Sequence, residues 1–217
     1  MRICLLLIFL LSACQTISTN QREVPDHIKA EDSYKLGLDQ AKNHDYHAAI
    51  SSFESAIHQY KNYVQAYVAL GGSYFFVLKF KDAKVQWGKA IALDPKSKEA
   101  YVGLGYLDFM DNEYDSAVQS FEAAISVDPN FSTAHAAIGR VYEQQGLTEK
   151  AITELELSIK LNPDEVMSYW VLSEIYATQG SKQKAEEYKN KALSIAERLH
   201  SNQVHGDSIQ PEIAMPK

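Results

Sequence analysis

The sequence contains very little cysteine and no block of positive charge. Only Cys4 and Cys14 occur among its 217 residues, so a framework of disulfides cannot hold the fold together. The formal net charge is −7, and no run of lysine or arginine is present. Recognition of nucleic acid requires a basic surface that displaces counterions. The composition therefore argues against both a disulfide-stapled domain and a nucleic-acid-binding protein.

Long hydrophobic runs are also absent, apart from a short one at the N-terminus. The segment from Ile3 to Leu11 is apolar, with Arg2 before it and small residues after it. A helix needs about 20 apolar residues to cross a bilayer, so this run is too short for a stable span. Its pattern is that of a secretory signal peptide. An ordinary export signal that happens to include a cysteine is one interpretation of it.

The end of this segment is more specific. Leu11-Ser12-Ala13-Cys14 resembles the bacterial lipobox, which implies that residues 1–13 are removed and that Cys14 is the site of lipid attachment, with two or three acyl chains such as palmitate. Residues 14–29 are polar and read as the lipidated N-terminus and a flexible tether. Gln15 rather than aspartate follows the cysteine, which by the same resemblance favours the outer membrane. We therefore expect a protein of the bacterial cell envelope, lipid-anchored and facing the periplasm.

An internal repeat of 34 residues occupies most of the chain. Equivalent residues recur from Ala30 to about Leu199 without insertion. Alanine and glycine recur where two helices would have to approach closely, and proline recurs at the end of the middle copies, where it would stop a helix. One complete copy is marked by Tyr67, Leu70, Gly71, Tyr74, Ala83, Trp87, Ala90 and Pro95.

This pattern resembles the tetratricopeptide repeat, in which each 34-residue unit is a pair of antiparallel helices. The resemblance implies an all-α fold, a right-handed superhelical solenoid of five tandem repeats within residues 30–200. Each unit buries its apolar stripe only by stacking on its neighbours. The tail at 201–217 is expected to be disordered. The five predicted units are 30–63, 64–97, 98–131, 132–165 and 166–199.

The sequence offers no constellation of catalytic residues. Gly71-Gly72 and Gly103-Leu104-Gly105 fall inside expected helices, whereas a phosphate-binding loop follows a strand. His44 and His47 lie at an expected turn, and their spacing fits no known metal motif. We therefore expect a protein that is not an enzyme, with no cofactor, no metal and no small-molecule substrate.

The first helices of the second and third units are apolar on every side. A helix turns about 100° per residue, which places one set of their side chains opposite the face that meets the second helix. By resemblance to the repeat family, this set lines the concave groove where partner proteins bind. Alternatively, curvature of the solenoid buries most of it. The predicted partner-binding residues are Val68, Gly72, Phe75, Phe76, Val102, Tyr106, Phe109, Met110, Arg140 and Trp170.

These features predict a membrane-tethered scaffold or assembly factor that binds an apolar or amphipathic segment of a partner protein in the concave groove. The lysine and asparagine clamp of carboxylate-binding members is absent, since Leu38, Ala69, Gly72 and Gly103 stand in its place. Lipoproteins of this repeat family that help type IV pilus secretins to assemble are one specific analogy. An adaptor of peptidoglycan enzymes and a self-associating structural protein are the alternatives. The sequence does not identify the partner.

Overall fold

The structure is a computed structural model that describes residues 26–205. The predicted signal peptide, Cys14, most of the tether and the tail beyond residue 205 lie outside the described residues. Within 26–205 the chain is entirely helical, and no helix there combines the length and apolar character that a membrane span requires. The helices are α2 (Asp26–Lys42), α3 (Tyr46–Gln59), α4 (Val64–Phe76), α5 (Phe80–Leu93), α6 (Lys98–Met110), α7 (Tyr114–Val127), α8 (Ser132–Gln144), α9 (Thr148–Leu161), α10 (Val166–Thr178) and α11 (Lys182–His205).

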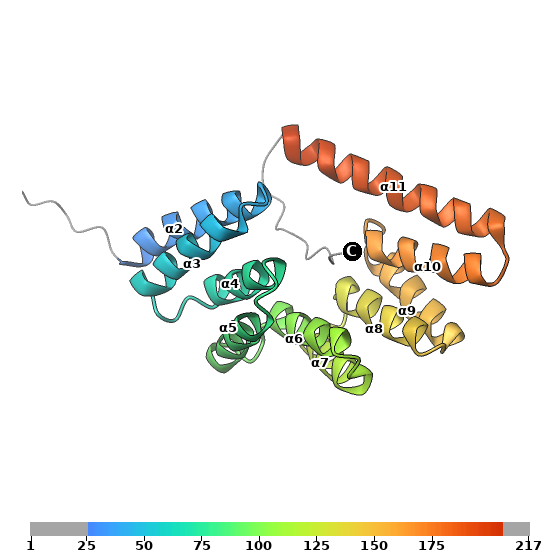
Figure 1. Ribbon diagram of the computed structural model, residues 1–217, viewed down its shortest axis with the longest axis horizontal. Coiled ribbons are helices and arrows are strands. Elements are labelled where there is room, and N and C mark those ends of the chain that lie inside the picture. The colour runs from blue at the N-terminus through green and yellow to red at the C-terminus, as the bar shows by residue number, and fades with distance from the viewer. Residues whose placement is uncertain (1–25, 206–217) are drawn as a thin grey trace, which may run out of the picture.

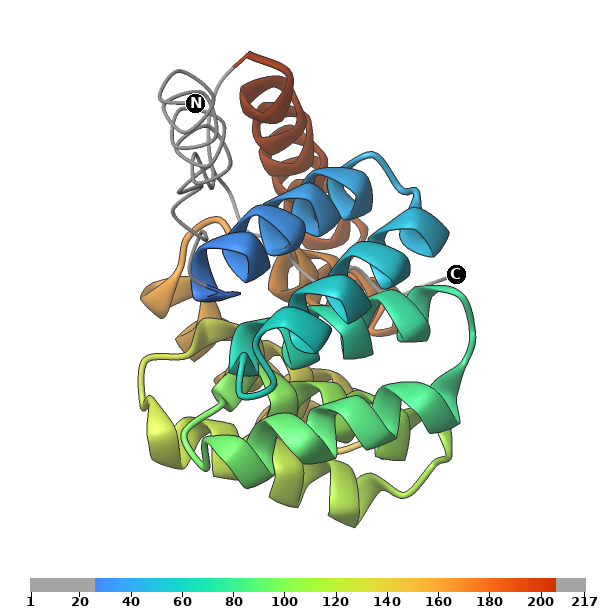
Figure 2. The ribbon, with the colours of Figure 1, turned by 90° about the vertical axis from the view of Figure 1, so that its left-hand side faces the viewer.

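Consecutive helices pair as five hairpins, which follow one another in a curved array (Figure 1). A second view shows neighbouring hairpins stacked side by side (Figure 2). The first helices of the last four hairpins begin at Val64, Lys98, Ser132 and Val166, which is a spacing of 34 residues. The prediction of an all-α solenoid of repeated helical hairpins is confirmed.

Both end helices are longer than the repeat alone predicts. Helix α2 begins at Asp26, inside the segment interpreted as a tether. Helix α11 has 24 residues and runs to His205, into the segment interpreted as a disordered tail. Glu197 replaces the proline that ends the middle units, so nothing at that position stops the helix.

Each hairpin turns through one residue with a positive φ angle. The five residues are 34 positions apart, and four of them are His, Asn or Gly, which tolerate this left-handed conformation. The exception is Leu78, at a φ of 61°. Its equivalents are His44, Asn112, Gly146 and Gly180.

The core lies between the two helices of each hairpin and between successive hairpins. Trp87 of α5 and Phe121 of α7 are completely buried. A Cβ atom added to Gly71 would lie 2.6 Å from Trp87 Nε1, and one added to Gly105 would lie 2.5 Å from Phe121 Cε1. Glycine is therefore required where an aromatic ring of the second helix packs on the backbone of the first, as the repeat pattern predicted.

Candidate functional site

The concave face is built by the first helices of successive units. Of the ten side chains predicted to line it, Met110 and Trp170 are exposed, at 40% and 43%. Five others are partly buried, and three are buried. The partly buried residues are Val68, Gly72, Phe76, Phe109 and Arg140.

The prediction is wrong for the three buried residues, Phe75, Val102 and Tyr106, which are at most 2% exposed. Phe75 packs against Phe80 and Trp87, with ring centroids 5.6 and 6.1 Å apart. These side chains belong to the core and cannot contact a partner.

The reason for the burial of Tyr106 lies in the next unit. Its ring meets Phe121 edge-on at 5.4 Å, and its hydroxyl lies 3.8 Å from Met167 Sδ, two units further along the chain. Helix α8 lies between them and carries only alanine at 134, 136 and 137, all buried. Because these side chains are small, the side chains of Tyr106 and Met167 can meet across α8. Tyr106 therefore fills part of the concave face and does not line it.

The concave face of the second unit is open at Gly72. A Cβ atom added to Gly72 would meet nothing within 4 Å, although the neighbouring Gly71 is tightly packed. At the position equivalent to Gly72, the first unit has Leu38 and the third has Tyr106. Gly72 therefore leaves open space at a position where both neighbouring units carry a large side chain. Val68 and Phe76, one turn before and after it on α4, are partly buried.

Two aromatic side chains of the concave face are held by neighbouring rings. Phe76 stacks on Tyr46 of the first unit with ring centroids 4.5 Å apart and an interplanar angle of 11°. Phe109 of α6 lies 5.9 Å from the ring of Tyr114. Both rings are held by neighbours yet remain partly exposed. Rigid aromatic side chains lose little conformational entropy when a partner binds.

Charge appears further along the same face. Arg140 of α8 forms an ion pair with Glu174 of α10 and lies 3.6 Å from Glu143. These groups are partly exposed, so the pairs contribute little to stability. The concave face thus changes from apolar around Gly72 to polar around Arg140.

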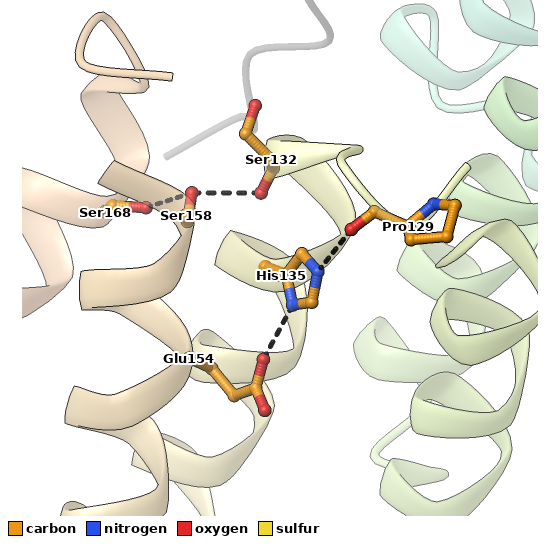
Figure 3. Close-up of polar contacts among 6 residues, drawn as sticks. All are labelled: Pro129, Ser132, His135, Glu154, Ser158 and Ser168. Carbon is orange, nitrogen blue, oxygen red and sulfur yellow. Dashed lines mark hydrogen bonds and ion pairs between the residues drawn. The ribbon is translucent and has the colours of Figure 1, made fainter. Parts of the chain in front are cut away.

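A polar cluster between α8, α9 and α10 was not predicted from the sequence (Figure 3). Ser158 Oγ donates a hydrogen bond to the carbonyl oxygen of Ser132 at 2.9 Å, and Ser168 Oγ donates to Ser158 Oγ at 2.8 Å. His135 places Nδ1 2.8 Å from Glu154 Oε2 and Nε2 3.3 Å from the carbonyl oxygen of Pro129. The sequence did contain a signal for this cluster. Ser158 replaces an alanine of the repeat pattern, and His135 replaces a tyrosine.

This cluster does not have the geometry of a catalytic site. His135 contacts a carboxylate and a backbone carbonyl, whereas a catalytic base would contact a nucleophile. Every buried side-chain nitrogen or oxygen in the described residues has a partner, and those residues contain no group of ligands suited to a metal ion. The Ser158–Ser168 hydrogen bond joins the fourth unit to the fifth, whereas His135 contacts Glu154 within the fourth unit and Pro129 at the end of the third.

Comparison with known proteins agrees with this architecture. Models of the tetratricopeptide repeat match residues 34–76, 132–165 and 168–198, and a TPR repeat model matches 107–146. Together these matches span more than half of the chain. A search of curated proteins gives no match.

Several solved structures share the fold. The crystal structure of MamA is 28% identical, with a TM-score of 0.56 over 77% of this chain and 98% of that chain. PilF from Pseudomonas aeruginosa is 20% identical, with a TM-score of 0.65 over 77% of each chain. PilW, a type IV pilus biogenesis factor, is 21% identical, with a TM-score of 0.67 over 77% of this chain and 78% of that chain. The repeat fold indicates a scaffold for protein–protein interactions, and the chain belongs to the tetratricopeptide repeat family.

Proposed function

We propose that this protein is a lipid-anchored scaffold that holds an apolar or amphipathic segment of a partner protein against the concave face of its second and third units. The observation that carries the proposal is the open gap at Gly72, one helical turn before the partly exposed ring of Phe76. A partner helix could place one apolar side chain in this gap and lay its apolar stripe along Val68 and Met110. Exposed apolar surface of this kind commonly marks an interaction site.

A photo-crosslinking amino acid placed at Met110 in cells tests the site directly, because Met110 is already exposed and the gap at Gly72 stays open. The matched control carries the same amino acid at Thr153, which is exposed on α9 in the fourth unit. We expect a discrete crosslinked protein from position 110 and none from position 153. Equal crosslinking from both positions would reject the site.

The membrane tether is tested separately. Cys14→Ser removes the atom to which a lipid would be attached, so the variant should move from the membrane fraction to the soluble fraction of the envelope. A chain that remains membrane-bound after this change, with the same extraction by detergent, would reject the lipid anchor.

A role in type IV pilus assembly is the narrower form of this proposal. It is supported by the lipobox resemblance and by the shared fold with PilF and PilW. Mass spectrometry of the protein crosslinked at residue 110 decides it. A secretin subunit supports this role, whereas a peptidoglycan hydrolase or synthase would replace it with a role in cell-wall assembly.

A further inference from the structure

The segment that contains α5 differs in charge from the rest of the chain. Residues 78–98 hold six lysines and two aspartates, a formal charge of +4 in a chain with a total of −7, so that all other residues together carry −11. The equivalent residues of the next two units, 112–132 and 146–166, carry −4 and −3. The lysines of this segment are Lys79, Lys81, Lys84, Lys89, Lys96 and Lys98.

Helix α5 lies on the outer side of the curved array, away from the concave face (Figure 1). Lys81, Val85 and Lys89 follow one another at intervals of four residues, and Ala92 lies two turns after Val85, so the four share one face. All four are exposed. The sequence shows no contiguous basic run, but helical geometry places two of these lysines on one surface, here called the basic face and defined by Lys81, Val85, Lys89 and Ala92.

Most of this positive charge is not neutralised within the protein. Among the residues that the structure describes, no ion pair involves Lys81, Lys89 or Lys96. Lys89 lies 5.7 Å from the ring centroid of Tyr67, a contact that leaves its charge in place. Lys84 approaches Asp108 only to 3.8 Å.

Large apolar side chains are exposed among these lysines. Leu78 at the start of α5 is 64% exposed, Val85 in its middle 52% and Leu93 at its end 41%. Leu78 also has the left-handed backbone conformation that costs an ordinary residue about 1–2 kcal/mol. A residue with a strained backbone and an exposed side chain makes no visible contribution to the stability of the fold. Such residues concentrate at functional sites.

We propose that the basic face and Leu78 bind the surface of an anionic phospholipid bilayer. Lysines close to an anionic membrane attract its headgroups, and leucine or valine between them can enter the boundary between headgroups and acyl chains. The proposal builds on the membrane tether proposed above, since an anchor would hold this weak surface close to the bilayer. The contact orients the solenoid, and it leaves the concave face, on the inner side of the array, free for a protein partner.

Vesicle binding tests this surface independently of the anchor. Every protein is the full chain with Cys14→Ser, so no acyl group contributes and the N-terminal segment is the same throughout. The readout is the ratio of affinities for phosphatidylcholine vesicles with and without phosphatidylglycerol. The test variant is Lys81→Glu with Lys89→Glu. The matched control is Lys160→Glu with Lys182→Glu, which makes the same change in net charge at two exposed lysines outside this face.

We expect the parent chain and the control to prefer anionic vesicles, and the test variant to lose about tenfold or more of that preference. Leu78→Gly should weaken binding to anionic vesicles without altering the charge. The preference should fall with added salt, because screening weakens the attraction to headgroups. Equal ratios for the test variant and the parent chain would overturn the proposal, as would an equal loss in the control. Envelope pull-down of an acidic protein that is lost in the test variant, with no vesicle preference in the parent, would assign the face to that protein instead.

Discussion

Trp87 of one unit lies flat against the backbone of Gly103 in the next. A Cβ atom added to Gly103 would be 2.4 Å from Trp87 Cε2, closer than any real contact between such atoms. The indole Nε1 donates a hydrogen bond of 3.1 Å to the carbonyl oxygen of Val68, which fixes the ring between the two units. The interface therefore depends on a tryptophan ring that packs against a glycine.

Residue size is matched in the same way at the other interfaces. The residue 16 positions after the large side chain becomes larger as that side chain becomes smaller. Gly103 packs directly on Trp87, and each of the other three pairs shares one hydrophobic cluster. Total volume at each junction is thereby nearly constant, as close packing requires. The pairs are Trp87 and Gly103, Phe53 and Ala69, Phe121 and Ala137, and Leu155 and Val171.

Gly103→Ala should lower the free energy of unfolding by about 1–3 kcal/mol, the usual cost of overpacking, although alanine is the better helix former. Trp87→Phe in the same chain should recover most of that loss, because phenylalanine faces alanine at two other interfaces. Urea unfolding followed by circular dichroism of the two single variants and the double variant measures the coupling. Additive effects would show that the two residues do not share one space.

Gly72→Leu should leave stability unchanged or raise it, although it lies on the same helix as the tightly packed Gly71. Its Cβ meets open space, and leucine favours a helix by roughly 1 kcal/mol over glycine. Filling the gap should abolish the partner crosslink, here read from a probe at Met110. Gly71→Leu is the contrasting variant and should unfold at much lower urea, because its side chain would overlap Trp87. Retained crosslinking by the stable Gly72→Leu protein would show that the gap is not the binding site.

Leu78→Gly should raise the free energy of unfolding by about 1 kcal/mol, because glycine adopts the positive φ angle of this turn without strain. Gly146→Leu is the matched control at the equivalent turn, where φ is 74°, and should lower stability by a similar amount. Thermal unfolding of both variants provides the measurement. A loss of stability in Leu78→Gly would mean that the leucine side chain contributes to the core after all.

Ser158→Ala should destabilise the protein by about 1–3 kcal/mol, since the buried hydroxyl of Ser168 would lose its acceptor. Ser168→Ala in addition should restore part of this loss, because alanine is the residue of the repeat pattern at both positions and leaves fewer unpaired polar groups there. A double-mutant cycle from urea unfolding measures this. A double variant as unstable as the sum of the two single variants would contradict the expectation.

Stability at low pH should depend on Glu31 of α2. The hydroxyl of Tyr63 donates a hydrogen bond to its carboxylate and lowers the pKa of Glu31 below its ordinary value, despite the opposing effect of partial burial. A carboxyl group whose pKa is lower in the folded state adds stability above the unfolded pKa, and that stability is lost as pH falls through the folded value. Tyr63→Phe should therefore reduce the loss of stability on acidification below about pH 5. Identical pH profiles for the two proteins would show that this hydrogen bond has no such role.

The sequence by itself determined the helices and their order. Glycine, alanine and proline at intervals of 34 residues specify where helices approach and where they end, because these constraints act on local backbone geometry. The repeat also predicted that Gly71 would lie against the second helix of its hairpin, and it does. The lipid anchor and the binding of a partner protein on the concave face remain predictions.

Only the tertiary structure decided which side chains of the concave face are open. Phe75 and Phe76 are adjacent in a helix that is apolar on all sides, yet one is buried in the core and the other remains partly exposed. Tyr106 is buried because α8, a different helix, carries alanines that let the side chains of Tyr106 and Met167 meet. Periodicity within one helix reports the direction of a side chain, whereas its exposure depends on the volumes of residues up to two units away. Residues 72 and 103 are both glycine, so the sequence alone does not distinguish them. In the structure Gly72 faces open space, whereas Gly103 packs against Trp87.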